Sequence, residues 1–155
     1  MAKTKTDTVS APRRAAGARK GTAARKARAV AGAPQAKIPR LPKAVAIAVR
    51  AARDRKAEDI VVLDLRKAGG FTDYFVICTG TNPRQINAIA DAVDATLRSD
   101  LGERPALAEG TDRSEWILLD YFDFVVHVFS RECRAFYDLE RLWGNAERYA
   151  IVDEP

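Results

Sequence analysis

Two groups of residues in this 155-residue chain have side chains or backbone groups that could take part in catalysis or in nucleotide binding. Cys78 carries a thiol and His127 is the single histidine, and a thiol nucleophile needs such a base beside it. The run Thr79-Gly80-Thr81-Asn82 leads into a helical pattern, where backbone amides could hold a phosphate. Each group would support catalysis or nucleotide binding only if its surroundings supply the remaining parts.

Those surroundings complete neither site. His127 stands between two valines in an apolar stretch, which is typical of a buried structural histidine, and no nucleophile turn surrounds Cys78. The loop at Gly80 lacks the lysine of a Walker motif and the spacing of GxGxxG, so turn and helix-capping chemistry explains it better.

Paired acids that could hold magnesium against a triphosphate are missing from the predicted strands. Asp64 is isolated between two leucines, and Asp120 and Asp123 lie on either side of a predicted turn. The sequence therefore predicts a protein that is not an enzyme, with no catalytic residues, metal site or cofactor. The alternative is a small nucleotide-binding or nucleotidyltransferase-like enzyme with a pocket at Gly80–Asn82.

The segment Glu109–Asp123 (EGTDRSEWILLDYFD) has the composition of a protein-binding surface. Strand alternation places Trp116, Leu118 and Asp120 on one face and Ile117 on the other. Around the tryptophan, Arg113 is the single basic residue, and the acidic residues are Glu109, Asp112, Glu115, Asp120 and Asp123. An aromatic anchor with an acidic rim suits a basic partner protein, although ordinary packing of Trp116 under a helix would give the same pattern.

Hydrophobic periodicity and capping residues predict the elements that position these residues. Helices are expected over 42–56, from the N-cap Asn82 to Gly102, and from the N-cap Ser130 to Gly144, the last with Phe136, Leu139 and Trp143 on one face. Strands are expected at Asp59–Arg66, Tyr74–Thr79, Pro105–Glu109, Glu115–Tyr121 and Phe124–Ser130. This order predicts an α+β fold in which a five-stranded mixed sheet is flanked by helices.

The charge divides the chain into parts of opposite sign. Residues 1–42 hold 11 Lys and Arg against the single acid Asp7, whereas the other 113 residues hold 15 basic and 20 acidic side chains and all 12 aromatic residues. We therefore expect a disordered basic tail over 1–40, a folded domain over 41–148 and a C-terminal tail over 149–155. A tail of this composition could contact RNA, but the acidic domain would be repelled by it.

The termini and cysteines bear on the compartment. The start of the chain is polar, without the apolar run of a signal peptide, and no stretch has the length of a membrane span. Cys78 and Cys133 suit two reduced thiols. We expect a cytoplasmic protein without a membrane partner, with organellar targeting by the Arg-rich tail as the alternative.

Several spaced motifs resemble the ribosomal silencing factor S family, also called the Iojap-like proteins. The resemblance runs from about Lys43 to Trp143. It is carried by DYFVICTGT at 73–81, RQ at 84–85, IAD at 89–91, EG at 109–110, WILLD at 116–120, VVHVF at 125–129 and RAFYDLERLW at 134–143.

The resemblance implies a translational repressor whose domain at 41–148 resembles a nucleotidyltransferase without the catalytic acids. It implies binding to the large ribosomal subunit through its protein number fourteen, which sterically blocks association with the small subunit, and self-association as a homodimer off the ribosome. The family's partner-binding tryptophan corresponds to Trp116. We extend that surface to Glu109, Ile117, Leu118 and Asp120 of the same segment.

Overall fold

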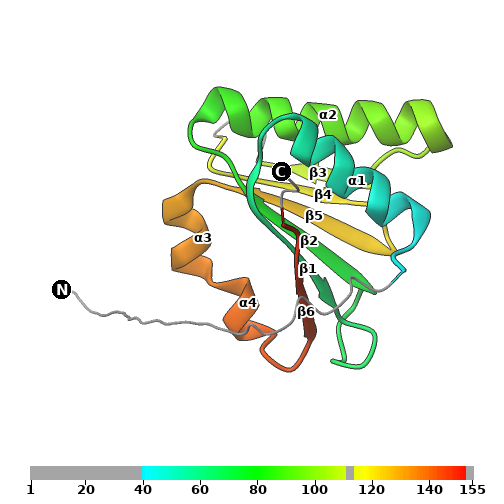
Figure 1. Ribbon diagram of the computed structural model, residues 1–155, viewed down its shortest axis with the longest axis vertical. Helices are drawn as coiled ribbons and strands as arrows, with labels where there is room; N and C mark the ends of the chain where they lie inside the picture. Colours follow the sequence, from blue (N-terminus) through cyan, green and yellow to red (C-terminus); the bar gives the residue numbers. More distant parts are fainter. Residues whose placement is uncertain (1–39, 111–113, 153–155) are drawn as a thin grey trace. The chain divides into compact units, whose positions relative to one another are not determined.

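The computed structural model describes residues 40–110 and 114–152, so that residues 1–39 of the expected tail, and Asp112 and Arg113, lie outside the description. The elements of the described part are α1 (Lys43–Asp54), β1 (Glu58–Asp64), β2 (Tyr74–Thr79), α2 (Pro83–Leu101), β3 (Leu107–Glu109), β4 (Trp116–Asp120), β5 (Phe124–Phe129), α3 (Arg131–Tyr137), α4 (Leu139–Leu142) and β6 (Glu147–Ala150). The mixed α+β class is confirmed, and Figure 1 shows its arrangement.

The strands form one mixed sheet in the order β3-β4-β5-β2-β1-β6. Within the described residues, β2 and β5 are the only neighbouring strands that run parallel, with Tyr74 opposite Phe124. The expected count of five strands is wrong, because β6 pairs antiparallel with β1 and places Ala150 opposite Val61. This strand runs into the segment expected as a tail from residue 149. Its sequence, ERYA, lacks apolar alternation because an edge strand takes its conformation from backbone bonds to its neighbour.

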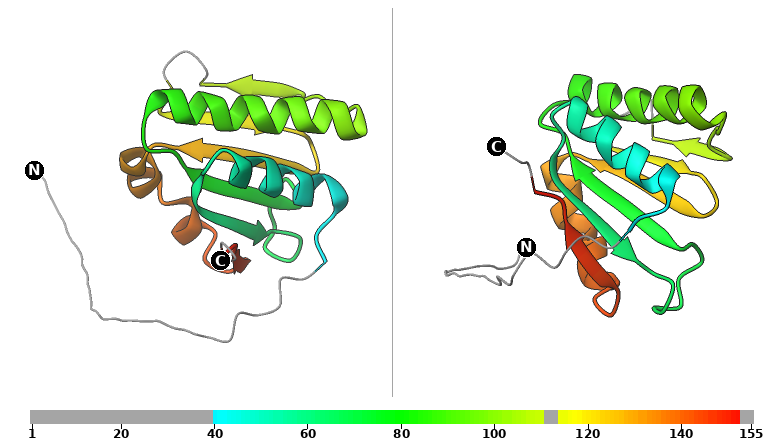
Figure 2. Two further views of the ribbon diagram at one scale, coloured as in Figure 1. Left: turned by 45° about the horizontal axis from the view of Figure 1, so that its top comes forward. Right: turned by 45° about the vertical axis from the view of Figure 1, so that its right-hand side comes forward.

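Helices α1 and α2 lie side by side over one face of the sheet (Figures 1 and 2). The α2 N-terminus is fixed as expected, since the Asn82 side chain accepts a hydrogen bond from the Gln85 amide at 2.8 Å and Pro83 is the first helical residue. Gly102 ends the helix in the left-handed conformation. The buried stripe of α2 is Ile86, Ile89, Ala90, Val93 and Leu97. Among the described residues, no helix has the length and apolarity needed to cross a bilayer.

The opposite face of the sheet is covered only in part. Its buried cluster comprises Val61, Leu63, Leu65, Phe75, Ile77, Val125 and Phe129. Leu139 and Trp143 from the α3–α4 region pack against this cluster, and α3 and α4 lie on this side of the sheet in both views (Figures 1 and 2). Strand β3 remains exposed along its whole length. The uncovered part of this face therefore lies at the β3–β4 end.

The single final helix expected from Ser130 to Gly144 is interrupted. Ser130 caps α3 as expected, but Asp138 adopts a left-handed conformation with φ of 45° and separates α3 from α4. Glu140 binds Arg134 at 3.0 Å and Arg148 at 3.1 Å, which ties both short helices to β6. The break turns Phe136 outward, leaving it 81% exposed, so its expected place on a common face with Leu139 and Trp143 is wrong.

Candidate protein-interaction surface

Strands β3 and β4 bring together one partly exposed group of side chains, which we call the open face: Leu107, Glu109, Trp116, Leu118 and Asp120. Leu107 pairs with Asp120 and Glu109 with Leu118 across the antiparallel ladder. Directly paired residues point to the same side of a sheet. Four of the five residues expected at the partner-binding surface therefore share one side, and Leu107 joins them.

Ile117 does not belong to this surface. It is fully buried on the side covered by α1 and α2. The burial of β4 alternates between partly exposed and buried residues, because successive side chains point to opposite sides of a strand. The expected alternation is thus confirmed, and the extension of the partner-binding surface to Ile117 is wrong.

Trp116 is held by aromatic contacts on this face. Its ring stacks on Phe129 with centroids 4.9 Å apart, and the Tyr137 ring from α3 lies 4.5 Å away. Its indole Nε1–H donates a hydrogen bond to Nδ1 of His127 at 3.1 Å. A side chain fixed before binding loses little conformational entropy when a partner covers it. Trp116 is therefore a pre-oriented anchor, neither fully buried nor freely mobile.

His127 is a buried neutral histidine, as its apolar strand suggested. Burial lowers the pKa of His127 to about 3. Its ring meets Phe75 edge-on with centroids 4.5 Å apart. Because Nδ1 accepts the indole hydrogen, the neutral ring carries its proton on Nε2. The imidazole supports the position of Trp116. Its lone pair on Nδ1 is already engaged in that hydrogen bond, so His127 is not available as a general base.

We expect the stability of the fold to fall on mild acidification because of His127. Its pKa lies near 6.5 in the unfolded chain and about 3 in the fold, so between pH 6.5 and 5 only the unfolded chain takes up this proton. The free energy of unfolding should be highest above pH 6.5 and drop by about 2 kcal/mol by pH 5. Urea unfolding across this range measures the slope. His127→Gln should flatten it, and an unchanged slope in that variant would refute the assignment.

The thiol and the imidazole lie on opposite sides of the sheet. Cys78 packs among the residues beneath α1 and α2, whereas His127 contacts Phe75 on the other side. In the parallel register His127 pairs with Ile77, one residue before the cysteine. Burial raises the pKa of Cys78 to about 12, so the thiol stays protonated at neutral pH. This geometry rules out a Cys78–His127 pair.

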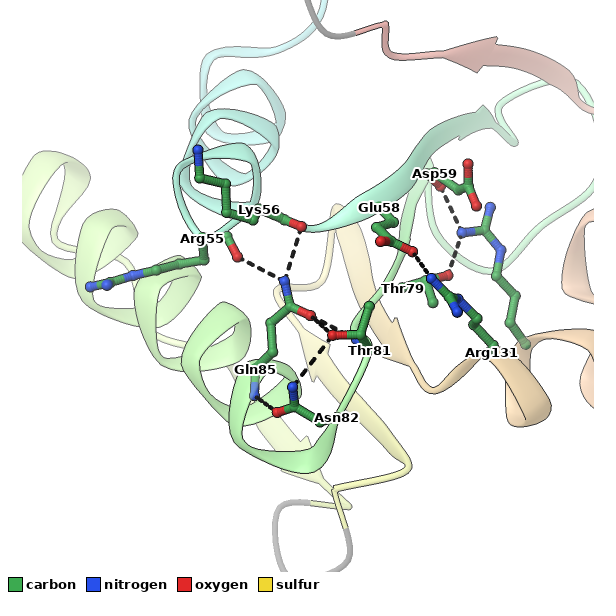
Figure 3. Close-up of polar contacts among 10 residues, drawn as sticks. Arg55, Lys56, Glu58, Asp59, Thr79, Thr81, Asn82, Gln85 and Arg131 are labelled. Carbon is green, nitrogen blue, oxygen red and sulfur yellow. Dashed lines mark hydrogen bonds and ion pairs between the residues drawn. The ribbon is translucent and has the colours of Figure 1, made fainter.

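The loop at Gly80–Asn82 lines a surface pocket, but its polar groups are already paired (Figure 3). The Gln85 side chain accepts hydrogen bonds from the Thr81 amide at 2.7 Å and from its hydroxyl at 2.8 Å. The same side chain donates to the carbonyl oxygens of Arg55 and Lys56 at 3.1 and 3.0 Å. Gln85 therefore links both this loop and the end of α1 to the start of α2, which supports the capping interpretation of this sequence.

The charges around this pocket oppose a nucleotide. Glu115 and Glu132 line it together with Arg131, and Figure 3 shows Arg131 directed to Glu58, which its guanidinium binds at 2.7 Å. Two carboxylates and one already paired cation would repel a triphosphate. The charges of this pocket therefore do not favour the nucleotide-binding alternative.

The acids of the strands are engaged separately. Asp64 forms two hydrogen bonds with the Arg66 guanidinium, at 3.0 and 2.8 Å, and this contact lowers the pKa of Asp64. One carboxylate oxygen of Asp120 accepts the Phe122 amide at 2.8 Å. Within residues 40–110 and 114–152, no three histidine, cysteine or acidic side chains gather where they could hold a metal ion.

Sequence reasoning missed two aromatic residues beside the open face. Tyr137 contacts the Trp116 ring, and the largely exposed Phe136 meets Tyr137 edge-on with centroids 5.0 Å apart. Their adjacency gave no signal, because consecutive residues can share one buried stripe of a helix, as Ile89 and Ala90 do in α2.

The fold and the open face define a class of protein: an α+β domain that presents a pre-oriented aromatic and acidic sheet surface. A family model described as ribosomal silencing factor during starvation matches residues 38–155, and the chain belongs to this family. The description of this family names a factor that silences ribosomes during starvation.

Individual relatives agree with this assignment. The ribosomal silencing factor RsfS of Bacillus subtilis (strain 168) is 41% identical over 100 residues, which cover 64% of this chain and 84% of that protein. The mitochondrial assembly of ribosomal large subunit protein 1 of Mus musculus is 33% identical over 96 residues, covering 59% and 41% of the two chains. A crystal structure of a protein from Chromobacterium violaceum has a TM-score of 0.64 and 33% identity, covering 72% of this chain and 92% of that one.

Proposed function

We propose that this protein is a translational repressor that binds the large ribosomal subunit through the subunit's protein number fourteen and blocks association with the small subunit. The observation that carries the proposal is the open face, where Trp116 is held partly exposed between aromatic rings beside Glu109 and Asp120. Family membership supports the ribosome as the target, and the name of the mouse relative points to the large subunit.

Charge favours a protein contact for the domain and an RNA contact for the tail. Residues 43–155 carry a net charge of −5, so ribosomal RNA would repel this part, whereas a basic ribosomal protein would attract it. We propose that the basic segment 1–40 contacts nearby ribosomal RNA. Off the ribosome, self-association as a homodimer would use surface that overlaps the open face.

Pelleting with purified ribosomal subunits tests the function. We expect the full chain to co-sediment with isolated large subunits and not with small ones, and to reduce the light-scattering rise when the two subunits are mixed. Serum albumin at the same concentration is the control for nonspecific trapping. A chain that stays in the supernatant, or that pellets without inhibiting subunit joining, would contradict the proposal.

A regulatory role suits these features better than catalysis. The Gly80–Asn82 loop is paired internally, and acids line its pocket, so we do not favour a nucleotide-binding or nucleotidyltransferase-like enzyme. The bacterial relatives favour a cytoplasmic site of action. The mitochondrial relative keeps organellar targeting by the Arg-rich segment as the alternative.

A further inference from the structure

Two aromatic side chains project into solvent at the end of the sheet where β2 and β5 begin. Phe71, in the β1–β2 loop, is 76% exposed, and Phe122, in the turn between β4 and β5, is 80% exposed. The two loops are joined, because the buried Thr72 hydroxyl donates to the Phe122 carbonyl at 2.8 Å and the Asp73 amide donates to the Asp123 carbonyl at 3.0 Å. We call Phe71 and Phe122 the aromatic tip.

The backbone of Phe122 is in a conformation that phenylalanine rarely adopts. Its φ is 79°, in the region that favours glycine, and a bulky residue there is strained. Hydrogen bonds hold it in place, from its own amide to Asp120 and to its carbonyl from Thr72. With four-fifths of the residue exposed, the ring gains little packing in return. The aromatic side chain thus adds little to the stability of the domain, which suggests that it serves a contact outside it.

The tip continues the open face and shares its charge. Asp120 belongs to the open face and also accepts the Phe122 amide, so the two regions meet at this residue. The carboxylates of Asp73 and Asp123 are exposed beside the tip, while Lys67 lies on the same loop as Phe71. Exposed rings among acids suit a basic protein surface, as the open face does.

We propose that the aromatic tip is a second anchor for the basic partner protein that binds the open face, with Phe122 as the main contact. This inference rests on the proposed function and adds to it a contact that Trp116 alone does not provide. Interface energy concentrates in aromatic residues that become buried on binding, and two separated anchors also fix the orientation of the partner.

Substitution of Phe122 separates binding from folding. In Phe122→Gly we expect the affinity of the full chain for isolated large subunits to fall at least tenfold, because the ring is gone, while the melting temperature does not fall, because glycine accepts this backbone. Phe122→Asn should behave alike, since asparagine also tolerates positive φ. Phe122→Tyr keeps an aromatic ring and therefore keeps the main contact. Its affinity should lie within about twofold of the wild type.

The outcomes distinguish this inference from the function on which it rests. Unchanged subunit binding in Phe122→Gly, with binding still lost in Trp116→Glu, would overturn the second anchor alone. A lower melting temperature in Phe122→Gly would overturn it by making the ring structural. Loss of self-association in sedimentation equilibrium with intact subunit binding would assign the tip to a second copy of the chain. A wild type that does not bind large subunits would overturn both proposals.

Discussion

Trp116→Glu should reduce binding to isolated large ribosomal subunits by about 100-fold, the loss expected when a central aromatic anchor worth roughly 3 kcal/mol is removed. The substitution deletes the ring that Phe129 and Tyr137 hold in place. It also puts a carboxylate where an apolar contact would form, and burying that charge without a matched partner is costly. Co-sedimentation over a range of subunit concentrations measures the change.

Two further variants show whether a loss of binding in Trp116→Glu comes from the missing contact or from unfolding. The substitution also removes the hydrogen bond to His127, so the melting temperature should fall modestly and must be measured alongside. Leu107→Glu alters the same face on an exposed edge strand and should weaken binding about tenfold without a stability cost, as for a secondary interface residue. Ala46→Glu adds the same charge on α1, over the other side of the sheet, and should bind normally. Normal binding by Trp116→Glu would exclude the open face as the partner site.

Local patterns were sufficient for most elements of the fold. The bounds of α2 follow from Asn82 and Gly102, which act through their own hydrogen-bonding and backbone preferences. The alternation of β4 placed Trp116 and Leu118 together because a side chain's direction in a strand depends only on its position. Ile117 was misassigned because it was grouped with its neighbours in the sequence, although its side chain points to the opposite side of the sheet.

The errors occur where distant residues decide the conformation. Strand β6 is polar and becomes a strand through bonding to β1, which its own sequence does not encode. The break at Asp138 is stabilised by the bonds of Glu140 to Arg134 and Arg148, one from each flanking element. A helical pattern read through this break assigned Phe136 to the core. The same cause hid the aromatic residues next to the open face.

Gly110 ends β3 and should be the least replaceable glycine of the domain. Its φ is 86°, and a methyl group on it would overlap the Trp116 carbonyl oxygen, a backbone atom that cannot move without shifting the start of β4. Gly110→Ala should therefore lower the free energy of unfolding by about 3 kcal/mol or more, combining backbone strain with a steric clash. Urea unfolding measures this loss.

Gly102 provides the matched comparison. It also has a positive φ, of 68°, but a methyl group there meets nothing within 4 Å. Gly102→Ala should therefore cost only the strain of the left-handed backbone, about 1 kcal/mol. Because the clash at Gly110 involves the residue that anchors the open face, Gly110→Ala should also weaken binding to large subunits, whereas Gly102→Ala should not. Equal effects of the two substitutions would mean that the β3–β4 connection does not position Trp116.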